Sequence, residues 1–224
     1  MNTVWYAYLG WIVIAALFGF LVSFLFAGRL HFSRRVFLVP YVILSSLFLY
    51  AFIQWSGLSF WELLWHHWLW GLAGAVLLAI FLVKNVFSQP VSARTGGISL
   101  VFDILWLGLI YGLTDALLLS VFPVLAAWQS FTLLGWTLTW PGRILVGLLA
   151  VLASFLVTTA YHLGYPEYKG RALMGPVIGN TTMTLGYLIT TNPLAAMISH
   201  MAMHIAGVYH GPASVVQLPP HYQS

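Results

Sequence analysis

Charged residues are scarce in this chain and cysteine is absent. Only 5% of its 224 residues are charged, eight Lys or Arg against four Asp or Glu, whereas soluble domains carry about 25%. The few basic side chains are scattered and form no patch, which excludes a nucleic-acid partner. The absence of cysteine excludes disulfides and thiolate chemistry, so a metal ion would need His, Asp or Glu ligands.

Apolar residues make up most of the chain, at 61% of its length. They gather into runs close to the ~20 residues that a helix needs to cross a bilayer. The first run is too long for a cleavable signal peptide and is expected to remain as a span. The sequence therefore predicts an all-α, polytopic integral membrane helical bundle of about seven transmembrane helices. We expect these at residues 4–27, 36–55, 63–83, 99–125, 143–162, 174–191 and 194–209.

The basic residues indicate how these spans are oriented. Seven of the eight follow the first, third or fifth span, and only Arg143 lies on the other side. Because cytoplasmic loops are enriched in Lys and Arg, we expect the N-terminus outside and the C-terminus in the cytoplasm. The expected location is a bacterial plasma membrane, with membrane lipid as a partner.

A linker rich in Pro, Gly and Ser divides the chain. It separates a three-helix segment at 1–87 from a four-helix core at 99–210, with the linker itself at 88–98. The polar segment 211–224 begins with Gly211-Pro212, which ends the last helix. We expect this tail to fold back over the cytoplasmic mouth of the bundle.

The fourth expected span carries a buried carboxylate. Gly108, Gly112 and Asp115 fall on one helix face, where small residues let a neighbouring helix approach closely. Asp115 should therefore point into the protein, where an ionisable group is a functional candidate by default. Pro123 is expected to kink or end this helix and to free backbone groups near Asp115.

Histidines occur on the later spans at helical spacing. Ser154, Thr158 and His162 form a polar ridge, and His200 and His204 lie one turn apart on a single face, as the ligands of one ion do. Together with Asp115 the three histidines form a candidate ligand set for zinc, manganese or iron. The alternative for each histidine is an interhelical hydrogen bond that only holds the bundle together.

The expected positions of His162 and His200 along their helices leave a second site possible. By helix rise, His162 lies about 28 Å from Arg143, whereas His200 lies only about 10 Å from the turn at 192–193. Helix tilt, helix breaks or a re-entrant segment at 127–142 would be needed to bring the two together. Otherwise Glu167, a candidate partner or additional metal ligand, would form an inner cluster with His162 and His210.

Residues 100–210 resemble the CPBP membrane proteins, the family of CAAX prenyl proteases and bacteriocin-processing enzymes. The resemblance is carried by LGYLITTNPLAAMISHMAMHIAG (185–207), FLVTTAYHLGYP (155–166) and GLTDALLLSVF (112–122). His200 and His162 match histidines of the family motifs, and His204 stands at an Asn position. Thr114 and Asp115 replace the paired glutamates, Leu119 replaces an arginine, and Thr158 replaces a phenylalanine.

The resemblance implies an intramembrane protease that acts on a membrane-embedded peptide. In it Asp115, His162, His200 and His204 would be catalytic, with a divalent metal ion or Asp115 activating water. The departures at Thr114 and Leu119 leave a second reading open. In that reading the chain is a catalytically inactive scaffold or assembly partner for other membrane-protein subunits. A secondary transporter is disfavoured, because the sequence shows no inverted repeat.

Overall fold

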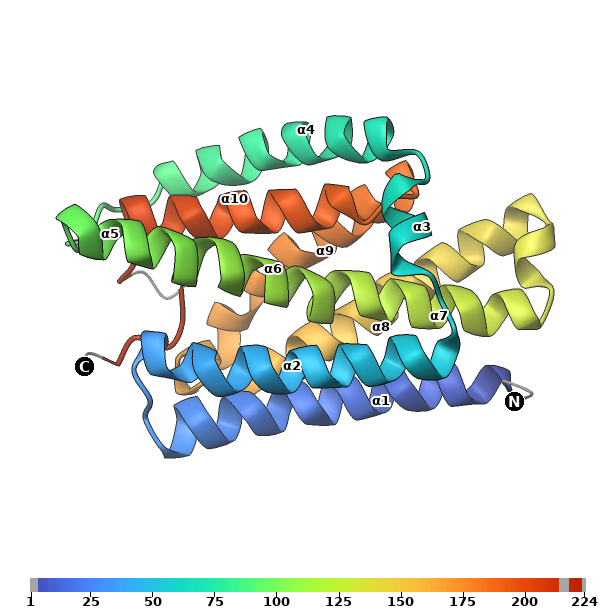
Figure 1. Cartoon of the computed structure of the whole chain (residues 1–224), viewed down its shortest axis with the longest axis horizontal. Coiled ribbons are helices and arrows are strands. Elements are labelled where there is room, and N and C mark those ends of the chain that lie inside the picture. The colour runs from blue at the N-terminus through green and yellow to red at the C-terminus, as the bar shows by residue number, and fades with distance from the viewer. Residues whose placement is uncertain (1–3, 214–217, 223–224) are drawn as a thin grey trace.

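Helices account for all regular structure in the part of the chain that the computed structural model describes, residues 4–213 and 218–222. No strand occurs within these ranges, which confirms the predicted all-α class. The long helices run side by side (Figure 1), and their outward faces carry exposed apolar side chains such as Leu17, Leu77 and Leu152. Such faces are those that a hydrocarbon environment accommodates.

Five helical segments among the described residues are long and apolar enough to cross a membrane. They are Trp5–Arg29, α2 (Arg34–Ser56), α4 (Trp68–Phe87), Gly97–Leu133 and α8 (Trp140–Leu163). The first of these consists of α1 (Trp5–Val22) and the π-helical η1 (Ser23–Arg29). Two further helices, α9 (Met174–Thr190) and α10 (Leu194–His210), have 17 residues each. Their bounds agree closely with the last two expected spans.

The third expected span begins later than the sequence indicated. Residues 60–65 form a separate short helix, α3 (Phe60–Trp65), in which the Ser59 side chain accepts a hydrogen bond from the Glu62 backbone N–H. His67 then adopts a left-handed backbone conformation with φ of 55°. This conformation interrupts the helix, so α4 begins at Trp68 rather than at residue 63.

The fourth expected span is longer than predicted. One 37-residue segment comprises α5 (Gly97–Asp103), η2 (Ile104–Ile110), α6 (Tyr111–Asp115), η3 (Ala116–Val121) and α7 (Phe122–Leu133), of which η2 and η3 are π-helical. Pro123 does not end it at residue 125. Proline cannot donate to the carbonyl four residues earlier, and that carbonyl, of Leu119, instead accepts from Ser154 Oγ at 2.7 Å and Asn180 Nδ2 at 3.2 Å.

A tight turn follows this segment instead of the re-entrant segment considered at 127–142. It contains one short helix, η4 (Trp136–Leu138), and α8 starts directly after Thr139. The α7–α8 hairpin extends well beyond the turn that joins α9 to α10 (Figure 1). The α7–α8 and α9–α10 turns therefore lie at different levels along the bundle (Figure 1), so the depth calculation, which started from both turns, does not hold.

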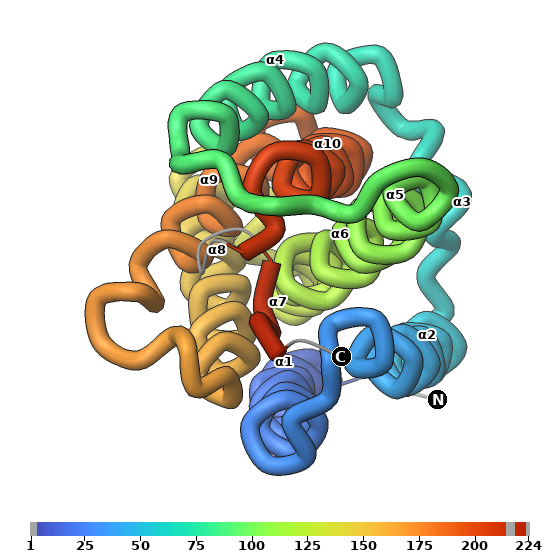
Figure 2. Tube along the Cα trace, turned by 90° about the vertical axis from the view of Figure 1, so that its left-hand side faces the viewer, coloured from blue at the N-terminus to red at the C-terminus, as the bar shows by residue number. Residues whose placement is uncertain are grey.

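Helix α10 lies at the centre of the bundle, enclosed by α4, α6 and α9 (Figure 2). The small-residue face expected around Gly108 and Gly112 is where α10 comes closest. A Cβ atom added to Gly112 would lie 2.8 Å from the Met201 Cα, and one added to Gly108 would lie 3.1 Å from the Ile205 Cα. Glycine at these positions thus sets the spacing between the two helices.

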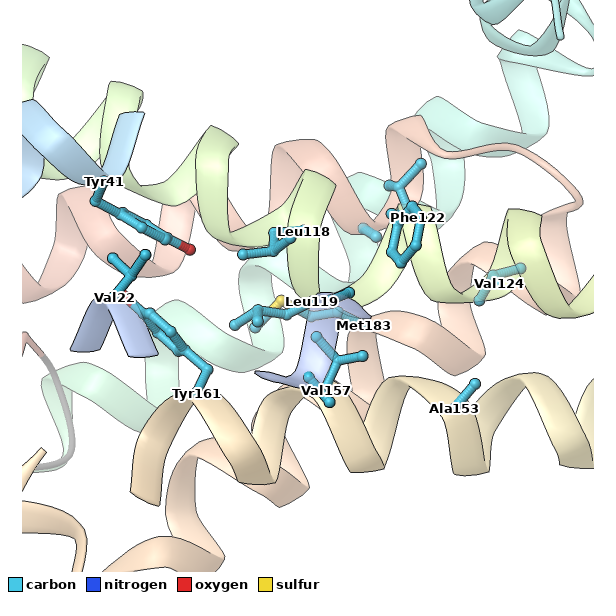
Figure 3. Close-up of a cluster of buried hydrophobic side chains, with 14 of the residues drawn as sticks. Val22, Tyr41, Leu118, Leu119, Phe122, Val124, Ala153, Val157, Tyr161 and Met183 are labelled. Carbon is cyan, nitrogen blue, oxygen red and sulfur yellow. The ribbon is translucent and has the colours of Figure 1, made fainter. Parts of the chain in front are cut away.

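One continuous core joins the predicted front and back segments. Helix α4 packs along α10, and α1 packs along α8. Figure 3 shows side chains from α1, α2, the long segment and α8 meeting in this core, including those of Val22, Tyr41, Leu118, Leu119, Val157 and Tyr161. Two short helices, η5 (Pro166–Tyr168) and η6 (Gly170–Leu173), connect α8 to α9.

Candidate metal centre in a polar cavity

Asp115 meets two histidines of α10 inside the bundle. The Nε2 atoms of His200 and His204 lie 4.0 Å and 3.5 Å from Asp115 Oδ2. One potential ligand atom from each of the three residues falls within 4.8 Å of the others. All three residues are at most 4% exposed, so the group is enclosed by protein.

The donor atoms of this group fit a divalent cation. Tetrahedral zinc sites, with bonds of about 2.0–2.1 Å, place their ligand atoms roughly 3.3 Å apart, close to the separations seen here. Tyr41 donates a 2.6 Å hydrogen bond to Asp115 Oδ1, which leaves Oδ2 facing the imidazoles. Two imidazole nitrogens and one carboxylate oxygen form a set used by zinc and by non-haem iron.

His200 contains a buried nitrogen for which the surrounding protein provides no partner. Its Nδ1 atom has no hydrogen-bond partner among the described residues. Buried polar atoms are nearly always satisfied, so an exception is informative. The other ring nitrogen, Nε2, faces Asp115. Since Nδ1 makes no hydrogen bond, nothing on that side of the ring fixes its tautomer.

His162 lies in the wall of the same cavity but outside the three-residue group. A cavity of about 390 Å³ is lined by Asp115, His162, His200 and His204, together with a few other polar residues (Asn85, Gln89, Asn180 and Thr182) and many apolar side chains. His162 Nδ1 lies 2.8 Å from the Thr158 carbonyl oxygen. Since a carbonyl only accepts, Nδ1 carries the proton and Nε2 has the free lone pair. All four residues predicted to be catalytic therefore line one cavity, but only three of them form the potential metal-binding group.

Glu167 lies elsewhere. Its Oε1 accepts a 3.0 Å hydrogen bond from the His221 backbone N–H and lies 3.7 Å from His221 Nδ1. Burial alone would raise the pKa of Glu167, but the hydrogen bonds from His221 outweigh it and hold the pKa below its usual value. His210 pairs with the Gln89 carbonyl at 2.9 Å. The inner cluster considered for His162, Glu167 and His210 is therefore not assembled, because each has a different partner.

The C-terminal tail packs against the cavity. Leu218, Pro219 and Pro220 are buried, and Pro219 lines the cavity that contains the histidines. The Pro219 carbonyl accepts a 3.1 Å hydrogen bond from the Tyr111 hydroxyl. This agrees with the expectation that the tail folds back over the bundle. Residues 214–217 and 223–224 of the predicted tail lie outside the described residues.

A cluster of buried tyrosines was missed from the sequence. The Tyr111 hydroxyl lies 3.0 Å and 3.1 Å from those of Tyr161 and Tyr165. Together with Tyr41 and Tyr168, these residues are almost completely inaccessible to solvent. The recurrence of tyrosine at positions 161, 165 and 168 was the available signal, although only Tyr161 lies on α8 and the other two lie in the connection to α9.

The polar residues around Asn180 hold neighbouring helices together. Asn180 Nδ2 donates to Thr158 Oγ1 at 2.6 Å and to Ser154 Oγ at 3.0 Å, and Asn180 Oδ1 accepts from Ser120 at 2.7 Å. This network joins α8, α9 and the π-helical turn η3. Ser154 and Thr158 of the predicted polar ridge belong to it, whereas His162 on the same ridge faces the cavity.

Comparison with known proteins supplies no relative. No family model, no curated protein and no solved structure matches this chain. The functional conclusion therefore depends on the chemistry of the cavity.

Proposed function

We propose that this chain is a membrane-embedded hydrolase, a divergent protein of the CPBP type, in which Asp115, His200 and His204 bind one divalent metal ion. The observation that carries the proposal is the convergence of a carboxylate and two imidazoles at 3.5–4.0 Å in a buried cavity. Ionisable groups at membrane depth are costly and mark functional sites. Zinc, manganese and iron are the candidate ions.

The membrane placement follows from the helices. Five described segments meet the requirements for a span, and α9 and α10, at 17 residues each, are at the lower end of the ~17–25 residues found in transmembrane helices. In this proposal all seven segments span the membrane, and the distribution of Lys and Arg supports an N-terminus outside and a C-terminus in the cytoplasm. The CPBP-like region at 100–210 corresponds to the long Gly97–Leu133 segment and to α8, α9 and α10.

Each residue of the cavity has a distinct task in this proposal. A bound divalent ion would acidify a coordinated water and polarise a carbonyl group. Tyr41 orients Asp115 through its hydrogen bond to Oδ1. The unprotonated Nε2 of His162 can accept a proton within the cavity. Thr114, at a glutamate position of the family motif, hydrogen-bonds to the Ile110 carbonyl of its own helix, so Asp115 acts without a second carboxylate.

The lining of the cavity supports one substrate class. Its volume of about 390 Å³ and its wall of apolar side chains, among them Phe81, Ile178 and Met203, suit a short apolar segment. A peptide segment within the membrane, with its carbonyl directed at Asp115 and the histidines, matches both features. The residues that would hold the ion are at most 4% exposed, which limits the access of bulk water to the reacting bond.

Metal analysis of the protein purified in detergent tests the proposal. We expect about one equivalent of metal in the wild type and its loss in a His200→Ala/His204→Ala double variant. His162→Ala should keep the metal but slow the cleavage of an apolar peptide by roughly 10²-fold or more, as for loss of a general base. Absence of metal from the wild type, with an unchanged melting temperature in the double variant, would contradict the hydrolase and favour the inactive scaffold.

A further inference from the structure

A second cavity lies at the end of the bundle where α2 begins, and it is rich in arginine. It has a volume of about 360 Å³ and is lined by Ser33, Arg34, Arg35, Arg94, Thr95 and Asp103, together with apolar and tail residues. Three arginines and a single carboxylate therefore line one cavity. This concentration is unusual in a chain with only eight basic residues, and the proposed hydrolase mechanism does not use it.

The single carboxylate of this cavity is already fully engaged. Arg35 binds both Asp103 oxygens at 2.7 Å, and Thr95 Oγ1 donates to Asp103 Oδ2 at 2.7 Å. Within the described ranges, no carboxylate lies within 4.0 Å of Arg34 or Arg94. Arg94 donates to the Tyr209 carbonyl at 2.7 Å and lies over the Tyr209 ring, so two arginines of the cavity have no carboxylate partner.

Arg34 in particular has donor groups that the protein leaves unused. Its Nη2 donates to the Pro212 carbonyl at 2.7 Å, but its Nε is buried and has no hydrogen-bond partner among the described residues. Arg34 is also the first residue of α2, a 23-residue helix whose preceding Ser33 forms no side-chain cap. The backbone N–H groups of a helix's first turn have no partner within the helix and favour an anion.

We propose that this cavity binds the phosphate group of an anionic phospholipid. Planar guanidinium groups recognise phosphate oxygens with paired hydrogen bonds, and basic pockets at helix ends take lipid headgroups. The neighbouring surface suits the acyl chains, because Ile98 is 90% exposed and Phe102 is 50% exposed on α5. The proposal depends on the membrane placement given above but not on metal binding or on hydrolysis.

Native mass spectrometry of the purified protein with phosphatidylglycerol or phosphatidylcholine tests this site. We expect wild-type protein to bind phosphatidylglycerol at least tenfold more tightly than phosphatidylcholine. An Arg34→Gln/Arg94→Gln variant should lose this preference. The matched control is Lys169→Gln/Arg171→Gln, which removes two exposed charges from the α8–α9 connection near the same end of the bundle and should retain the preference.

Three results would overturn the proposal. These are unchanged lipid preference in the Arg34→Gln/Arg94→Gln variant, equal loss in both double variants, and sub-millimolar binding of inorganic phosphate without binding of phosphatidylglycerol. The last result would assign the cavity to free phosphate. Arg94→Gln alone, at an exposed position, serves if the double variant fails to fold. Retained metal in these variants separates this site from the Asp115 group.

Discussion

Replacing Gly112 by alanine should disturb the Asp115 group without altering any of its side chains. The added Cβ would lie 2.8 Å from the Met201 Cα and 3.1 Å from the His200 carbonyl oxygen, and the first distance is 0.6 Å short of 3.4 Å, where ordinary contact begins. Both neighbours are backbone atoms of α10, so the helix itself must move. This movement of α10 displaces the helical turn that carries His200.

The expected effect can be estimated from this geometry. Overpacking of this kind costs about 1–3 kcal/mol of stability. A shift of this size in a metal ligand should weaken metal affinity about tenfold, comparable to the effect of mutations that misorient a ligand. Thermal unfolding in detergent measures the first quantity, and titration with zinc monitored by calorimetry measures the second.

Gly147→Ala provides the matched control. Gly147 is also a helical glycine, on α8, but a Cβ added there has no neighbour within 4 Å. This variant should be unchanged or more stable by about 0.5–1 kcal/mol, because alanine favours the helix. If Gly112→Ala behaves like Gly147→Ala in both assays, the close approach of α10 does not position the histidines and the reasoning fails.

Three further variants test other parts of the structure. Tyr41→Phe removes the hydrogen bond to the site carboxylate and should lower the free energy of unfolding by about 1.5–3 kcal/mol, as measured by thermal unfolding; an unchanged melting temperature would rule out this role. Asn180→Ala should cost about 1–3 kcal/mol by leaving buried partners unsatisfied, whereas Thr182→Ala, at a half-buried position and bonded only to the Ile178 carbonyl of its own helix, should cost much less. His221 lowers the pKa of Glu167, so the interaction between them stabilises the fold above the usual pKa of 4.5, and this stabilisation is lost as pH falls through the lower folded-state pKa. Glu167→Gln should therefore make the melting temperature depend less on pH between about pH 3 and pH 6. Equally steep pH profiles for the wild type and the variant would contradict this.

Helix positions could largely be predicted from the sequence because hydrophobic length determines them directly. The expected spans at 174–191 and 194–209 agree with α9 and α10. The prediction was wrong about the end of the fourth span, which continues past Pro123 to Leu133, whereas the expected freeing of a backbone group by Pro123 is confirmed at Leu119. Side chains from α8 and α9 satisfy the freed Leu119 carbonyl, and such compensation from distant residues is not visible in a local sequence pattern.

The candidate site was predictable in part. The i, i+4 spacing of His200 and His204 and the glycine face below Asp115 are local features, and the structure brings these residues together. The position of His162 along the bundle axis could not be derived from the sequence, because it depends on how far the α7–α8 hairpin extends beyond the other turns. The contact between Glu167 and His221 joins the α8–α9 connection to the tail, and no spacing rule links such segments.

X-ray absorption spectroscopy of the metal-loaded protein most directly tests the claim that Asp115, His200 and His204 form one metal site. We predict two imidazole nitrogens and at least one oxygen at about 2.0–2.2 Å from a single ion, and loss of the imidazole contribution in His200→Ala/His204→Ala. A spectrum without imidazole ligands, or one that is unchanged in that variant, would contradict the claim.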